Sequence, residues 1–165
     1  MKQSLLIPAA AAILVATAPA SSRLSASPAS ASPATSSACT FATLPRAASA
    51  GEQTLYGHIR SLKSKGSRFV LRFDPAWYLT GTTATRAKLE DTGSGDVAND
   101  VYVRDESHRL LTYLVPATAR VTVLTHATCS TRTTVARLAK AVPAAGFWLL
   151  VRGDTVRSID QQYHP

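Results

Sequence analysis

The stretch that decides the fold is residues 55–73, which read LYGHIRSLKSKGSRFVLRF. Apolar or small residues alternate with polar or amphipathic ones on both sides of the turn-forming residues 64–67, at Leu55, Gly57 and Ile59 and then at Phe69, Leu71 and Phe73. A period of two is typical of strands that bury one face. The segment therefore predicts a β-hairpin.

Apolar segments after the hairpin predict further strands. Valines alternate at positions 101 and 103 and again at 121 and 123, and residues 110–115 form a short apolar run. Residues 147–151 are nearly all apolar, which indicates a strand covered on both faces. Gly153-Asp154 then favours a type II′ turn into a last strand, because glycine accepts a positive φ.

Two short helices are predicted between these strands. Residues 131–142 place four apolar side chains on one face, with Ser130 or Thr131 as the N-cap and Pro143 as the stop. Residues 82–91 form a weaker candidate that ends before Gly93. The pattern predicts a small α+β domain on a mostly antiparallel sheet. A partly open β-barrel, similar to an oligonucleotide/oligosaccharide-binding fold, is one arrangement it allows.

Residues 1–20 have the layout of a secretory signal peptide. Lys2 precedes an apolar stretch over residues 5–15, and Ala18-Pro19-Ala20 supplies small residues before a cleavage site after Ala20. The alternative is a membrane anchor, but the apolar stretch is shorter than the roughly 20 residues that span a bilayer. We therefore expect a secreted protein, extracellular or periplasmic, with no transmembrane segment after cleavage.

Residues 21–50 consist mainly of Ala, Ser, Pro and Thr, a composition that cannot bury enough apolar surface to fold. All 10 acidic residues follow Gly51. These shifts predict a disordered linker over residues 21–50 and one folded domain over residues 51–165.

The chain is basic, with 18 Lys and Arg against 10 Asp and Glu and a net charge of +8. Five cations lie close together in the hairpin with no acid among them: Arg60, Lys63, Lys65, Arg68 and Arg72. Such a stripe can bind an anionic surface, although a solvated hairpin tip is the simpler interpretation. An anionic cell-envelope polymer is the expected partner if there is one, and nucleic acid is not expected, because an exported protein seldom meets it.

A second candidate ligand site follows the hairpin, where Asp74 lies close to Trp77 and Tyr78. Exposed rings stack on sugars and a carboxylate accepts hydrogen bonds from hydroxyl groups, so this composition suits a glycan site. The structural alternative, which we favour, is that Asp74 ends the strand and caps a turn while Trp77 anchors the core.

The same region carries a family resemblance. The chain resembles small exported bacterial proteins of actinobacterial type over about residues 55–164, in the blocks Phe73-Asp74-Pro75-Ala76-Trp77-Tyr78-Leu79-Thr80-Gly81, Leu89-Glu90-Asp91-Thr92-Gly93 and Asn99-Asp100-Val101-Tyr102-Val103-Arg104. The resemblance also includes a final strand pair with an acidic, aromatic tail. It supports the domain boundary and implies no catalytic residue.

Residues for catalysis do not form a recognisable constellation. The histidines at 58, 108, 126 and 164 are scattered, and no nucleophile elbow, phosphate-binding loop or set of metal ligands is present in the sequence. We therefore expect a non-catalytic domain without cofactor or metal, which binds an anionic or glycan component of the envelope. The alternative is an exported hydrolase with a dispersed site around Asp74, Asp100 and one histidine.

The chain has two cysteines, Cys39 and Cys129. Export would place them in an oxidising compartment, where disulfides persist. We predict that they form a disulfide that ties the end of the linker to the segment before the second helix.

Overall fold

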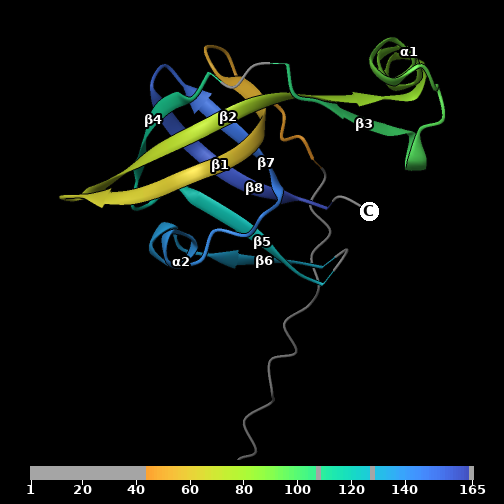
Figure 1. Ribbon diagram of the computed structural model, residues 1–165. Coiled ribbons are helices and arrows are strands. Elements are labelled where there is room, and N and C mark those ends of the chain that lie inside the picture. The colour runs from red at the N-terminus through yellow and green to blue at the C-terminus, as the bar shows by residue number, and fades with distance from the viewer. Residues whose placement is uncertain (1–43, 107–108, 127–128, 164–165) are drawn as a thin grey trace, which may run out of the picture. The chain divides into compact units, whose positions relative to one another are not determined.

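A computed structural model describes residues 44–106, 109–126 and 129–163 (Figure 1). The predicted signal peptide, most of the predicted linker and Cys39 lie outside the described residues. Within those three ranges, no helix is both long and apolar enough to cross a bilayer. The described chain forms β1 (Gln53–Lys65), β2 (Arg68–Thr80), α1 (Gly81–Thr92), η1 (Ala98–Asp100), β3 (Val101–Arg104), β4 (Leu111–Pro116), β5 (Arg120–His126), β6 (Cys129–Thr133), α2 (Val135–Lys140), β7 (Gly146–Arg152) and β8 (Thr155–Gln162).

The fold is α+β and dominated by its sheet, as the alternation in the sequence predicts. β1 and β2 form the predicted hairpin and pair from Lys65–Arg68 at the turn to Tyr56–Ala76. The turn between β7 and β8 falls at Gly153, whose φ of 55° is the positive value expected there. Most strand pairs are antiparallel, but β8 runs parallel to both β4 and β5, so the sheet is mixed.

The strands follow the order β3-β2-β1-β7-β8-β5-β6, and β4 joins β2 on one side and β8 on the other. The β4–β8 pairing is limited to Leu114 and Thr155. A continuous series of pairings consequently leads from β1 through β2, β4, β8 and β7 back to β1. The pairing of β2 with β3 and the packing of α1 lie beyond this series (Figure 1).

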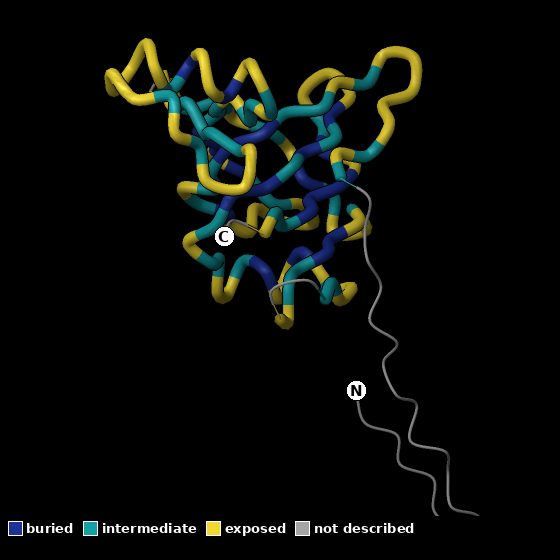
Figure 2. The backbone as a smooth tube through the Cα atoms, turned by 90° about the vertical axis from the view of Figure 1, so that its right-hand side faces the viewer, coloured by how far each residue is buried: buried dark blue, intermediate teal, exposed yellow. Residues whose placement is uncertain are grey.

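One hydrophobic core lies on the inner faces of these strands. Its largest fully buried side chains come from alternate positions of β2, β7 and β8, namely Leu71, Phe73, Phe147, Leu149 and Ile159. α2 adds Val135 and Leu138 to the same cluster. Figure 2 shows the buried residues gathered in the interior of the folded part and the exposed ones around its outside. The alternation in the sequence thus reports which face of each strand is buried.

The second predicted helix begins later than expected. α2 starts at Val135, and the hydroxyl of Thr134 caps it by accepting a hydrogen bond of 3.2 Å from the Arg137 amide. The prediction that Ser130 or Thr131 caps the helix is wrong, because both residues belong to β6, which pairs with β5. Threonine is favoured in strands, and the open edge of β5 provides the hydrogen-bonding partner.

Arg46 lies in the segment that its Ala, Ser, Pro and Thr content predicts to be a disordered linker, but it is part of the folded unit. Its Nε and Nη2 donate to Oδ2 and Oδ1 of Asp160 over 2.6 and 2.7 Å. Nearby, Nη2 of Arg152 donates to the carbonyl of Ala50 over 3.0 Å. The ordered part of the chain therefore begins before Gly51.

Candidate functional site

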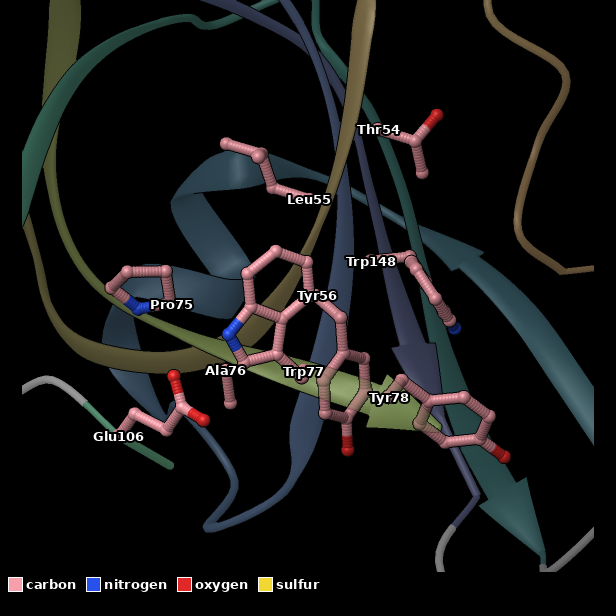
Figure 3. Close-up of a pocket in the computed structure, with 9 residues that line it drawn as sticks. All are labelled: Thr54, Leu55, Tyr56, Pro75, Ala76, Trp77, Tyr78, Glu106 and Trp148. Carbon is pink, nitrogen blue, oxygen red and sulfur yellow. The ribbon is translucent and has the colours of Figure 1, made fainter. Parts of the chain in front are cut away.

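β1 and β2 separate at the pair Tyr56–Ala76, and a cleft lies where they diverge. Before this pair, β1 has β7 as its partner, whereas β2 after it pairs with β3. The cleft has a volume of about 380 Å³ and is formed by the start of β1, the second half of β2, β7 and the segment after β3 (Figure 3). Its lining residues are Thr54, Leu55, Tyr56, Pro75, Ala76, Trp77, Tyr78, Glu106 and Trp148.

Three of the lining rings form a fixed aromatic wall. The ring centroids of Tyr56, Tyr78 and Trp148 lie 4.8 to 5.3 Å apart, with interplanar angles near 60°. Tilted and edge-to-face contacts of this kind are favourable for aromatic pairs. The indole of Trp148 also donates a 2.8 Å hydrogen bond to Oε1 of Gln162 in β8. These contacts hold the wall in one arrangement.

Trp77 is different, because 62% of its surface is exposed. Figure 3 shows its indole among the other lining side chains, with Glu106 and Pro75 on one side and Tyr78 on the other. It also lines a second hollow of about 320 Å³, together with residues of α1 and β3. The structural interpretation, in which Trp77 anchors the core, is therefore wrong. A large exposed indole between two hollows is instead suited to stack on a ligand.

Glu106 supplies the carboxylate of the cleft. Its Oε1 lies 3.1 Å from Nε of Arg104, and its side chain remains 54% exposed. Arg104 also contacts Glu90 over 3.4 Å and Asp91 over 2.5 Å, which connects the end of β3 to α1. The hydrogen bond from Arg104 lowers the pKa of Asp91. Arg104 thus orients Glu106 while leaving it open to hydrogen-bond donors.

Asp74 does not lie on the surface as the ligand-site prediction required. It is 2% exposed, and its Oδ2 accepts hydrogen bonds from Nε and Nη2 of Arg60 over 2.8 and 2.6 Å. β2 also continues through Asp74 instead of ending there. Pro75 is tolerated inside the strand because β4 pairs only as far as Phe73 and β3 begins to pair at Trp77, so no hydrogen bond is lost on that side.

The five cations of the basic stripe are divided by the structure. Arg60 lies at a bulge in β1 and is engaged by Asp74. The other four, Lys63, Lys65, Arg68 and Arg72, are exposed on the hairpin away from the cleft. Asp100, proposed for the alternative hydrolase site, lies in η1 and does not line the cleft.

Three cleft residues were missed by the sequence analysis: Tyr56, Glu106 and Trp148. Tyr56 lies on the face of β1 opposite to Leu55 and Gly57, so the alternation in the sequence already placed its ring outside the main core. Trp148 lies in a nearly continuous apolar run and Glu106 in a polar loop, and neither context distinguishes a site residue. Only the pairing of β1 with β7 places Trp148 beside Tyr56.

Comparisons of the chain with protein-family models, curated proteins and solved structures find no match. The resemblance to small exported bacterial proteins therefore stays a prediction. The disulfide also stays a prediction, because Cys129 lies in β6 while Cys39 is outside the described residues. Among the residues that the structure describes, no group of three or more His, Cys, Asp or Glu side chains could hold a metal ion.

Because the hydroxyl of Tyr56 is buried, we expect the protein to lose stability at alkaline pH. This hydroxyl is buried without a hydrogen-bond partner among the described residues, and burial, with a smaller contribution from Tyr78, raises the pKa of Tyr56 to about 12. The folded state therefore binds the phenol proton more tightly than the unfolded chain. The contribution of this proton to the free energy of unfolding is fully present below pH 10. About 2–3 kcal/mol of the free energy of unfolding should be lost as the pH rises from 10 to 12.

Urea unfolding between pH 9 and pH 12 measures this loss. Burial also raises the pKa of Tyr78 and Tyr113, so the contribution of Tyr56 is read as the difference between wild type and Tyr56→Phe. At pH 7 the variant should be nearly as stable as wild type, because the hydroxyl it removes has no partner. An identical decline in both proteins would contradict the assignment to Tyr56.

Proposed function

We propose that the protein is an exported, non-catalytic module that binds a glycan component of the cell envelope in the cleft beside Trp77. The exposed indole of Trp77, next to the oriented carboxylate of Glu106, is the observation on which the proposal rests. Asp74 has no part in it, because Arg60 already engages that carboxylate.

Each part of the cleft suits one feature of a sugar. The apolar face of a pyranose ring stacks on an indole, and its hydroxyl groups donate to a carboxylate. Alternate backbone N–H and C=O groups of a strand point to each side. Where β1 and β2 diverge, one residue of the pair Thr54 and Leu55 and one of the pair Trp77 and Tyr78 therefore directs its backbone groups to the side that has no β1–β2 pairing, which leaves hydrogen-bonding capacity for further hydroxyls.

The strand order supports a finer proposal about the fold. The pairings return to β1 after five strands, β1, β2, β4, β8 and β7. Five strands that close on one another are typical of the oligonucleotide/oligosaccharide-binding fold, a partly open barrel that also binds saccharides. We propose that these strands form such a barrel and that β2, beyond Ala76, extends from it to build the cleft with β3 and α1.

Replacing Trp77 by alanine is expected to weaken glycan binding about tenfold or more, because the stacking surface is removed. Isothermal titration of soluble peptidoglycan fragments into the purified protein measures the affinity, and sedimentation with insoluble cell-wall polysaccharide extends it to polymers. In a Trp148→Phe background, the remaining indole also reports stacking on Trp77 through its fluorescence.

Tyr163→Ala is the matched control, because Tyr163 is an exposed aromatic residue that does not line the cleft. It should bind like wild type. Equal binding by wild type and Trp77→Ala, or binding of none of these glycans by wild type, would contradict the proposal.

A further inference from the structure

Four cations of the hairpin have no ion-pair partner among the described residues: Lys63, Lys65, Arg68 and Arg72. Arg46, Arg60 and Arg104, by contrast, each contact at least one carboxylate. All four unpaired cations are exposed. Their charge is therefore available to a ligand.

The strand register places the four cations on one face of the sheet. Arg68, Val70 and Arg72 of β2 lie opposite Lys65, Lys63 and Ser61 of β1. The residues between them, Leu62 and Leu71, point inward and are buried. β4 extends the same face with Pro116, Leu114 and Thr112, which lie opposite Arg68, Val70 and Arg72. We call these nine residues the cationic face.

A solvated hairpin tip does not account for this arrangement. It explains Lys65 and Arg68, which flank the turn, but Arg72 lies between β1 and β4 in a three-stranded part of the sheet. Lys65 and Arg68 are directly opposite each other, and like charges in that position destabilise a sheet. None of the nine residues is acidic, so nothing on the cationic face compensates this repulsion.

We propose that the cationic face binds a linear polyanion with closely spaced phosphate groups. Residues two apart on a strand are about 6.6 Å from each other on one face, so Lys63 and Lys65 can contact successive charges of an extended chain. The guanidinium groups of Arg68 and Arg72 provide forked donors that match phosphate oxygens. The exposed side chain of Leu114 gives the face an apolar centre for the polymer backbone.

The composition of the face favours such a polymer over single-stranded nucleic acid. Proteins that bind single strands combine a basic groove with aromatic rings on which the bases stack. The cationic face has no aromatic residue, and the cleft rings begin only at Tyr56. Since Tyr56 and Lys65 are nine positions apart along β1, the two regions lie up to about 30 Å apart. This binding is therefore independent of the glycan proposal.

The test compares the affinity of the full chain for long-chain inorganic polyphosphate with that of the double variant Lys63→Gln/Arg72→Gln. The variant should bind at least about tenfold more weakly at low salt. With about four charges contacted, the slope of log affinity against log salt should be near −3 for wild type, and the variant should lose about half of it. The matched control is Arg137→Gln/Lys140→Gln, which removes two exposed cations from α2.

Equal weakening in both double variants would overturn the proposal, because net charge alone would then explain binding. Equal or tighter binding of poly-glutamate would overturn the choice of phosphate, and tighter binding of oligothymidylate would overturn it in favour of nucleic acid. Trp77→Ala should bind polyphosphate like wild type. A loss in that variant would contradict two independent sites.

Discussion

Alanine at position 57 is expected to destabilise the protein by about 3 kcal/mol or more. A Cβ atom at Gly57 would lie 2.0 Å from the backbone oxygen of Asp74 and 2.8 Å from Cα of Pro75. Both atoms belong to the backbone of β2, so neither can move without breaking the pairing that connects the hairpin to the cleft. Overpacking in a rigid site costs about 1–3 kcal/mol and sometimes more. Urea unfolding of wild type and Gly57→Ala measures the difference.

Gly153→Ala is the matched control for this change. Its Cβ would meet no atom within 4 Å, but its φ of 55° is unfavourable for a residue with a side chain. A cost of about 1–2 kcal/mol is expected from that backbone conformation alone. Gly57 has no positive φ, so its larger cost should come from close approach. A smaller loss for Gly57→Ala than for Gly153→Ala would show that β1 and β2 are not in tight contact there.

Arg46→Ala should destabilise the protein by about 3–5 kcal/mol. Asp160 is 1% exposed, and Arg46 is the partner of both its carboxylate oxygens. Removing one member of a buried ion pair leaves the other charge without compensation, which accounts for most of such a loss. The free energy of unfolding, from urea titration monitored by circular dichroism, tests the prediction.

The double variant Arg46→Ala/Asp160→Asn separates the ion pair from other contacts of Arg46. It removes the buried charge as well as its partner, so it should recover a large part of the stability lost by Arg46→Ala. A chain that begins at Gly51 should be destabilised like Arg46→Ala. If that shorter chain were as stable as wild type, the segment before Gly51 would not be part of the folded unit.

Local patterns in the sequence predicted the elements that local physics determines. The alternation from Leu55 to Phe73 identified the hairpin, because a strand with one buried face must alternate. α1 was predicted over residues 82–91, within one residue of its observed ends, and Gly93 follows its last residue as expected. The turn at Gly153 followed from the conformational freedom of glycine.

Local sequence patterns did not predict the contacts between segments that are distant along the chain. Arg46 and Asp160 are far apart in the chain, and nothing in the composition around Arg46 indicates a partner. Residues 131–133 are compatible with either a helix or a strand, and the edge of β5 decides for the strand. Asp74 had the composition of a surface acceptor, but the bulge at Arg60 brings a guanidinium onto it.

The candidate site separates what the local sequence determines from what the tertiary contacts decide. Residue periodicity alone establishes that the chain folds around a hairpin with one apolar face, because burial of that face depends only on neighbours two positions away. The cleft depends instead on β1 pairing with β7 but not with β2 before Tyr56, and on Arg104 holding Glu106 beside Trp77. Such pairings join residues that are distant along the chain, so they arise only when all the strands pack on a common core.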